Sequence, residues 1–152
     1  VYFVKGKRRE VFWVGVPLYL IIADTGVPSK TRDTVAEVAE KRQANPGRYK
    51  RLFDEIGDAV DEARDAIARG DLIRLGQLMN RNQGLLRDLD VSSRELEHLA
   101  AAALEAGALG AKLSGGGKGG CLIALVTQET QADVTSALLI ADADQVIQTV
   151  VH

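Results

Sequence analysis

The spacing of apolar residues along the chain predicts strands near both ends and helices between them. Residues 9–14 are rich in aromatic and β-branched side chains that alternate between two sides, which predicts a strand. After Pro17, the continuous apolar run 18–23 predicts a second strand, buried on both faces. That run stops at Asp24-Thr25-Gly26, a typical turn sequence.

Between residues 31 and 107, apolar residues recur every three or four positions, which predicts four amphipathic helices. The first begins at about Thr31 and ends at Asn45-Pro46-Gly47. Gly70 suits a helix C-terminus and Asp71 the N-cap of the next helix. The fourth helix opens with the capping-box spacing of Ser92 and Glu95.

The last third of the chain returns to mixed structure. We expect strands at 111–114, 121–126 and 146–151, with a helix at 131–139. The predicted order is therefore β-β-α-α-α-α-β-β-α-β. Strands at the ends and helices in the middle favour a single α+β domain over residues 1–152, with an antiparallel sheet and helices packed on one face.

Composition narrows the class of protein. The 152 residues are 46% apolar and carry a net charge of −2, so the chain is neither disordered by composition nor a basic nucleic-acid binder. Cys121 has no second cysteine to pair with, and no apolar run reaches the length of a membrane span. His98 and His152 have no companions at metal-ligand spacing, so no metal site is expected. We expect a cytoplasmic protein with no nucleic-acid or membrane partner.

Five of the fifteen glycines fall between residues 115 and 120, in the run Lys112-Leu113-Ser114-Gly115-Gly116-Gly117-Lys118-Gly119-Gly120-Cys121. Successive backbone N–H groups in such a loop can form an anion-binding concavity. The alternative is a flexible hairpin turn, whose folding entropy is costly. The run is not a P-loop, since Gly120 precedes Cys121, and a strand rather than a helix follows it, unlike a dinucleotide-binding fingerprint.

The segment from Asp24 to Thr31 is a second candidate. Asp24 and Thr25 can simply cap a turn, and Thr31 can be the N-cap of the first helix. A helix N-terminus at Thr31 would also suit an anion. Asp-Thr-Gly after an apolar strand occurs in aspartic proteases, but such an enzyme needs two carboxylates, hence a dimer, and the helical middle does not suit it.

Taken together, these two segments resemble the C-terminal half of the GHMP small-molecule kinases. The similarity extends over 20–38, over Met79-Asn80-Arg81-Asn82-Gln83 to Leu86, and over Gly107-Ala108-Leu109-Gly110-Ala111 into the strand 122–125. The resemblance implies ATP-dependent phosphorylation of a primary alcohol on a small carboxylic acid. It places the glycine loop, Ser114 to Gly120, beside the phosphates, and Thr31 and Asp24 near the substrate. The loop residues concerned are Ser114, Gly115, Gly116, Gly117, Lys118, Gly119 and Gly120.

The same resemblance identifies what the chain does not contain. The family's ATP loop, of the form Pro-x-x-x-Gly-Leu-Gly-Ser-Ser-Ala, is absent, as are its catalytic and Mg²⁺-binding carboxylates. We therefore expect ATP and Mg²⁺ only in a complete enzyme, assign no catalytic residue here, and expect the chain alone to be inactive. Its expected partners are a small-molecule substrate and the missing N-terminal half. Many family members have glycine at the position of Lys118. Two interpretations of the Lys118 side chain stay open: it contacts a phosphate, or it is solvated.

A non-catalytic interaction or oligomerisation domain derived from such a kinase is the alternative. It rests on the strands 18–23 and 121–126, which are apolar enough to need a covered environment, and it implies a homo-oligomer or another partner chain.

Overall fold

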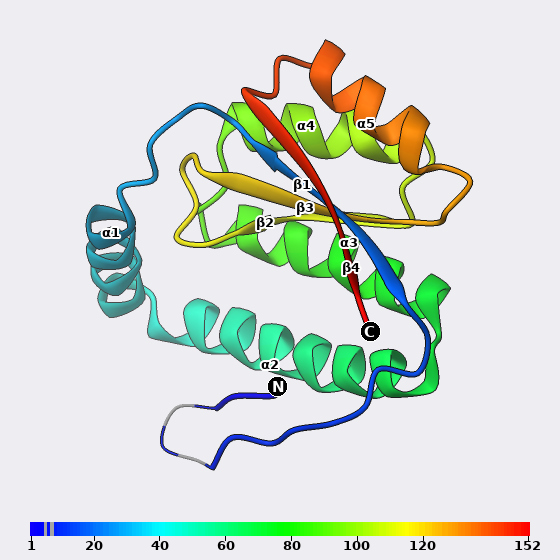
Figure 1. Ribbon diagram of the computed structural model, residues 1–152. Coiled ribbons are helices and arrows are strands. Elements are labelled where there is room, and N and C mark those ends of the chain that lie inside the picture. The colour runs from blue at the N-terminus through cyan, green and yellow to red at the C-terminus, as the bar shows by residue number, and fades with distance from the viewer. Residues whose placement is uncertain (5, 7) are drawn as a thin grey trace.

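A four-stranded antiparallel sheet and five helices make up the computed structural model, which describes residues 1–4, 6 and 8–152 (Figure 1). The elements are β1 (Leu18–Asp24), α1 (Thr31–Ala44), α2 (Pro46–Arg69), α3 (Leu72–Asp88), α4 (Arg94–Glu105), β2 (Gly110–Ser114), β3 (Cys121–Val126), α5 (Gln131–Ile140) and β4 (Gln145–Val151). The predicted α+β class is confirmed. None of the described helices is long and apolar enough to cross a membrane.

The strands lie in the order β2-β3-β1-β4, so β1 and β3 occupy the centre of the sheet. Ile21 lies opposite Ala124 and Ala23 opposite Leu122, which puts these four residues on the same face. All four are fully buried, in one core cluster with apolar residues of α4 and α5. Figure 1 shows α4 and α5 together on that side of the sheet. This layer is the helix-covered sheet that the sequence predicts.

Helix α3 runs along the outer edge of β2 rather than over the α4–α5 face. Asn80 accepts a hydrogen bond from the backbone N–H of Ala111 (2.9 Å), and Gln83 accepts one from that of Leu113 (2.8 Å). These amides occupy backbone donors that an edge strand would otherwise leave unpaired. Helix α2 packs on the other side of α3, as Figure 1 shows, in a second apolar cluster.

The close approach of α3 to β2 depends on two glycines. A Cβ atom at Gly76 would lie 2.3 Å from the carbonyl oxygen of Leu109, and one at Gly110 would lie 2.3 Å from that of Gly76. Side chains at either position would push the helix away from the strand, so the amides of α3 could no longer reach the backbone of β2.

The predicted strand at 9–14 is wrong. The segment before β1 runs along α2 and, among its described residues, has only an isolated bridge between Tyr2 and Glu10 (Figure 1). Trp13 is 91% exposed. The aromatic and β-branched residues of 9–14 favour an extended backbone, but a β-strand also needs a neighbouring strand to pair with. Both sides of β1 are already taken, by β3 and β4, so this segment cannot pair with the strand that follows it in the chain.

Two predicted caps are confirmed, because Gly70 is the C-cap of α2 and Asp71 the N-cap of α3. Asn45 and Asp71 accept hydrogen bonds from the backbone N–H groups of Arg48 and Arg74, as N-caps of α2 and α3. The N-cap of α4, however, is Ser93 rather than the predicted Ser92. The Ser92 hydroxyl instead hydrogen-bonds Gln83 of α3 and Glu97 of α4.

Candidate functional site

The glycine loop, residues 115–120, connects β2 to β3 and is enclosed on two sides. At Gly117, where φ is +78°, an added Cβ would lie 1.9 Å from the carbonyl oxygen of Val91. At Gly116 it would lie 2.5 Å from the hydroxyl oxygen of Thr31. Only glycine fits such close approaches, so the loop is a tightly packed element and the flexible-hairpin alternative is not supported.

The segment that follows β1 holds one side of the loop. The backbone N–H and the hydroxyl of Thr25 both donate to the carbonyl of Gly120, at 3.0 and 2.8 Å. The N–H of Gly120 donates to the carbonyl of Val27 (2.8 Å). The Ser29 hydroxyl donates to the carbonyl of Gly117 (2.8 Å). The two candidate segments of the sequence therefore form one site.

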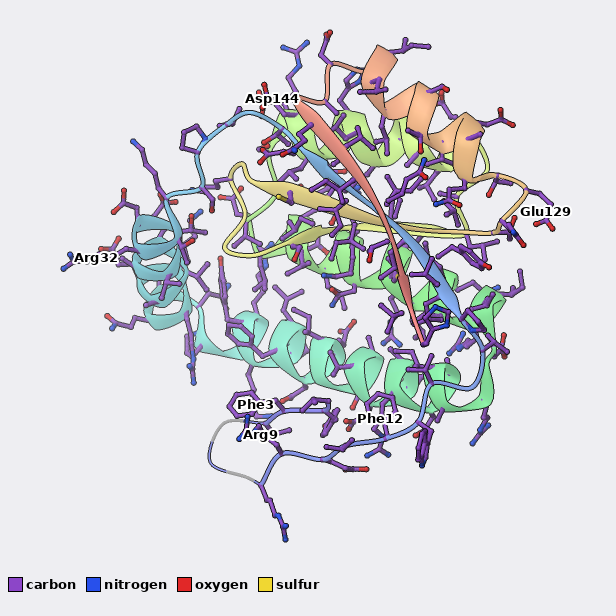
Figure 2. All side chains as sticks on the ribbon, in the orientation of Figure 1. Phe3, Arg9, Phe12, Arg32, Glu129 and Asp144 are labelled. Atoms are coloured by element: carbon purple, nitrogen blue, oxygen red, sulfur yellow. The ribbon has the colours of Figure 1, made fainter. Side chains whose placement is uncertain are left out.

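Thr31 is the first residue of α1, with Lys30 as the N-cap. The Lys30 side chain makes no capping bond, and the Thr31 hydroxyl lies 3.4 Å from that of Ser29. The suggestion that Thr31 itself caps the helix is thus wrong, because its hydroxyl faces the glycine loop. Arg32, the next residue, points away from the loop (Figure 2).

Several backbone donors at this junction remain available. Within the described part of the chain, the N–H groups of Gly115, Gly116 and Gly117 have no acceptor, nor do those of Thr31 and Arg32. The loop and the start of α1 thus bring unpaired N–H donors and the positive end of a helix dipole together. This arrangement is suited to an anion such as a phosphate group.

Asp24 lies at the end of β1, where its carboxylate stabilises the turn that follows. Its carboxylate accepts the backbone N–H of Gly26 at 2.9 Å, which forms the turn, and its second oxygen lies 3.9 Å from the sulfur of Cys121. Burial and the nearby Asp24 raise the pKa of the Cys121 thiol. Asp24 therefore supports the turn beside the loop, as the turn-cap interpretation expects, and the helix-rich fold does not suit a protease.

The two lysines of the loop region are held by the protein. The ammonium group of Lys118 pairs with Glu37 of α1, and its backbone N–H donates to the carbonyl of Val91 (2.8 Å). The ammonium group of Lys112 donates to the carbonyl of Leu113 (2.7 Å), and burial lowers its pKa. In this structure α1 supplies the counter-charge of Lys118, and its place beside a phosphate stays a prediction.

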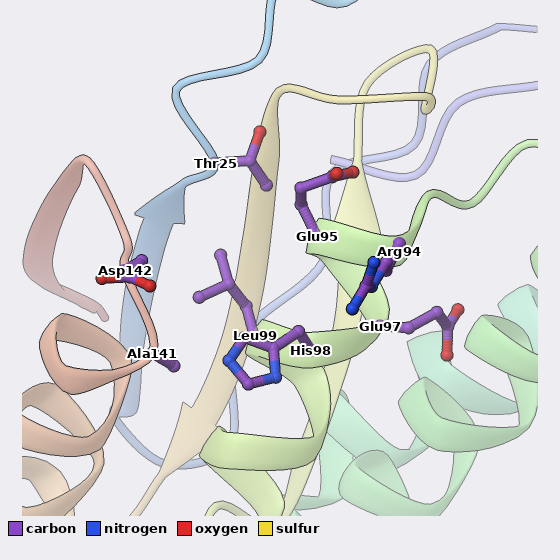
Figure 3. Close-up of a pocket in the computed structure, with 8 residues that line it drawn as sticks. All are labelled: Thr25, Arg94, Glu95, Glu97, His98, Leu99, Ala141 and Asp142. Atoms are coloured by element: carbon purple, nitrogen blue, oxygen red, sulfur yellow. The ribbon is translucent and has the colours of Figure 1, made fainter.

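A separate pocket of about 620 Å³ lies between the start of α4 and the turn after α5 (Figure 3). Figure 3 shows Arg94, Glu95 and His98 on α4, Asp142 in the turn after α5, and Thr25 just beyond the end of β1. The pocket mixes both signs of charge and has no residue of the glycine loop in its lining. It therefore adjoins the predicted anion site through Thr25 but does not include the glycine loop itself.

The sequence reasoning missed the α3–α4 turn as part of the site. Val91 contacts the loop, and behind it Ser92 joins Gln83 and Glu97 in a cluster of short hydrogen bonds. Asn80 and Gln83 recur at helical spacing on the face of α3 that meets β2, and this pair of amides is the signal that could have revealed the cluster.

Comparison with known proteins places this site in a family. The model described as GHMP kinases C terminal matches residues 63–143, just over half of the chain. The chain therefore belongs to the GHMP kinase C-terminal family. Similar curated proteins include mevalonate kinases: the chain is 37% identical to that of Thermococcus gammatolerans and 34% identical to that of Pyrococcus abyssi. Each match covers 97% of this chain.

A solved structure supports the same relationship. The crystal structure of L. major mevalonate kinase in complex with R-mevalonate superimposes with a TM-score of 0.90 at 38% identity. That match covers 94% of this chain and 45% of the other. The chain likewise spans only 44–45% of the length of the two curated relatives. It corresponds to one part of those enzymes, the C-terminal part.

Proposed function

We propose that this chain forms the acceptor-side half of an ATP-dependent kinase that phosphorylates the primary alcohol of mevalonate to give 5-phosphomevalonate, an isoprenoid precursor. The observation that carries the proposal is the junction of the glycine loop with the start of α1. There, unpaired N–H groups meet the hydroxyl of Thr31, at a site formed by two segments of a GHMP kinase domain. Similarity to mevalonate kinases supports the choice of acceptor.

In this proposal the N–H groups of Gly115–Gly117 bind a phosphate of the nucleotide, and Thr31 lies beside the acceptor hydroxyl. Preorganised donors of this kind stabilise the charge that is redistributed during phosphoryl transfer. Ser114 pairs with Cys121 at the base of the loop, Lys118 anchors its second half to Val91 and Glu37, and Asp24 shapes its flank. No residue of this chain takes a catalytic role, since none of these groups is placed as a base.

The donor set at the junction fits ATP phosphates but not Mg²⁺. Hard cations need oxygen ligands, above all carboxylates. Glu37 is paired with Lys118 and Asp24 closes a turn, and no group of three potential ligand residues occurs in the described part of the chain. We therefore propose that Mg²⁺ and its carboxylate ligands belong to the N-terminal part of a complete kinase.

The test is an ADP-release assay with mevalonate, ATP and Mg²⁺, run on the chain alone and on the chain fused behind the N-terminal part of the T. gammatolerans kinase. We expect no turnover by the chain alone and mevalonate-dependent turnover by the fusion. Phosphomevalonate and galactose serve as competing acceptors. Robust turnover by the chain alone would contradict its assignment as a half-site, and a folded fusion that prefers another acceptor would contradict the choice of mevalonate.

Thr31 offers a sharper test in the same fusion. Thr31→Val removes the hydroxyl and keeps the side-chain shape, so we expect turnover to fall at least about tenfold with little change in melting temperature. Thr31→Ser restores the hydroxyl and should recover much of the rate. Equal activity of the valine and serine variants would show that the hydroxyl has no role near the acceptor.

The interaction-domain alternative keeps one supporting observation. Strands β1 and β3, on which it rested, are the covered centre of the sheet. The edge strand β4, Gln-Val-Ile-Gln-Thr-Val-Val, instead has no charge or proline, and Ile147 is 47% exposed. Such an edge can accept another strand. Light scattering across a concentration series tests it, and a monomer at high concentration would speak against this function.

A further inference from the structure

We propose that Gln83 is a positioning residue for the glycine loop, acting through Leu113 and through the α3–α4 turn. This inference rests on the proposed function, in which the loop binds phosphate. Gln83 contacts neither the loop nor any reacting group, so its role is to fix where the N–H donors of the loop lie.

The Gln83 amide joins three elements. It is 4% exposed, its oxygen accepts the backbone N–H of Leu113 (2.8 Å), and its NH₂ group donates to Glu97 (2.8 Å) and to the Ser92 hydroxyl (3.1 Å). Ser92 also donates to Glu97 at 2.6 Å. A rotated amide would point its NH₂ at the N–H of Leu113 and its oxygen at a carboxylate, so a single orientation satisfies the cluster.

This cluster reaches both ends of the loop. Leu113 lies two residues before Gly115, so its hydrogen bond to Gln83 fixes the strand that enters the loop. Ser92 follows Val91, whose carbonyl accepts the N–H of Lys118 at 2.8 Å in the second half of the loop. The buried amide of Gln83 therefore connects the strand that enters the loop to the α3–α4 turn, which binds the second half of the loop.

The charge state of Glu97 strengthens the cluster. Burial raises the pKa of Glu97, but hydrogen bonds from Arg87, Ser92 and Gln83 outweigh it, and the net pKa is lowered. The ionised carboxylate accepts from Gln83 and Ser92 at one oxygen and from Arg87 at the other. Hydrogen bonds to a charged acceptor are stronger than neutral ones, which makes the position of Gln83 well determined.

Asn80 supplies a matched control on the same helix. It accepts from the N–H of Ala111 (2.9 Å) and donates to the carbonyl of Leu109 (3.4 Å). It thus closes the edge of β2 as Gln83 does, but it bonds neither the α3–α4 turn nor the residue that leads into the loop. Variants Gln83→Met and Asn80→Leu each replace an amide by an apolar group of similar size.

The experiment titrates inorganic pyrophosphate into the isotope-labelled chain and follows the backbone amide signals of Gly115–Gly117 by NMR. Thermal unfolding of each variant is measured in parallel. We expect saturable binding by the unsubstituted chain and a similar loss of melting temperature in both variants. We expect pyrophosphate affinity to fall about fivefold to tenfold in Gln83→Met alone, the factor that one net hydrogen bond represents.

The outcomes separate the two proposals. If the unsubstituted chain shows no saturable shifts at the loop, the phosphate-binding function of the loop is wrong, and this inference with it. If it binds and Gln83→Met binds equally well, or if Asn80→Leu loses as much affinity, only the positioning role is wrong. Ser92→Ala serves if Gln83→Met does not fold, since it leaves the amide in place. It should reduce affinity by a smaller factor, and unchanged affinity would count against the inference.

Discussion

Gly115 and Gly117 allow the packing of the glycine loop to be separated from its backbone strain. Both have positive φ, +95° and +78° respectively. An added Cβ at Gly115 meets nothing within 4 Å, whereas at Gly117 it would lie 1.9 Å from the carbonyl oxygen of Val91. The same substitution, glycine to alanine, therefore tests strain alone at the first position and strain plus collision at the second.

The magnitudes follow from this difference. A left-handed alanine costs about 1–2 kcal/mol, which is the whole expected loss for Gly115→Ala. At Gly117 the collision must also displace the loop from Val91 and break the hydrogen bond from the Lys118 N–H, adding about 0.5–1.5 kcal/mol. Repacking of the displaced loop adds to this, so we expect a total of about 2–4 kcal/mol for Gly117→Ala.

Chemical unfolding in urea, followed by circular dichroism, measures both values under one set of conditions. For a chain of this size, 1 kcal/mol corresponds to about 2–4 °C in melting temperature, so thermal scans give an independent check. Gly117→Ala should also weaken pyrophosphate binding more than Gly115→Ala does. Equal losses of stability at the two positions would refute the reasoning, because they would show that Val91 does not hold the loop.

Four further substitutions test the packing and charges around the site. Gly76→Ala should destabilise the protein by about 2–4 kcal/mol in urea unfolding because its Cβ collides with the backbone leading into β2, whereas Gly84→Ala, with open space around it, should stabilise α3 by about 0.5–1 kcal/mol. The lowered pKa of Glu97 adds stability that is present above its unfolded pKa and is lost as pH falls through its folded pKa, so urea midpoints of Glu97→Gln should fall less steeply in acid than those of the unsubstituted chain. Lys118→Gly should change pyrophosphate affinity less than about twofold in the NMR titration, because Glu37 already binds this ammonium group.

The sequence predicted the elements well where local pattern decides them. The apolar run 18–23 and the stripe of α2 specify their own faces, and Gly70 and Asp71 mark a helix end and the next helix start by local chemistry. The strand at 9–14 failed because strand formation depends on a neighbour that local sequence does not describe. Its residues are extended but run along α2 instead of joining the sheet.

The site was predictable only in part, for a similar reason. The glycines and the helix start beside Thr31 are visible in the sequence. The resemblance to the GHMP kinases predicted that the glycine loop and the segment from Asp24 to Thr31 form one site. Ser92 and Ser93 both suit an N-cap, and what separates them is tertiary: Gln83 and Glu97 capture Ser92, which leaves Ser93 to cap α4. Asn80 and Gln83 mark a polar face of α3 in the sequence, but nothing local shows that folding places this face against the edge of β2.

The proposed function divides phosphate binding and catalysis between two parts of a kinase, and the side chains around the loop are consistent with that division. Two acidic side chains near the loop are paired with cations, Glu37 with Lys118 and Asp90 with Lys41, and the carboxylate of Asp24 accepts the N–H of Gly26. What remains available at the junction is a set of backbone N–H donors, fixed in place by contacts within this chain alone. Such a surface can favour an anion, but it cannot by itself hold a divalent cation or move a proton, because its carboxylates are occupied. A second half that brings free carboxylates to the same junction would supply what this half lacks, so pyrophosphate binding should survive in the isolated chain while turnover should require the fusion.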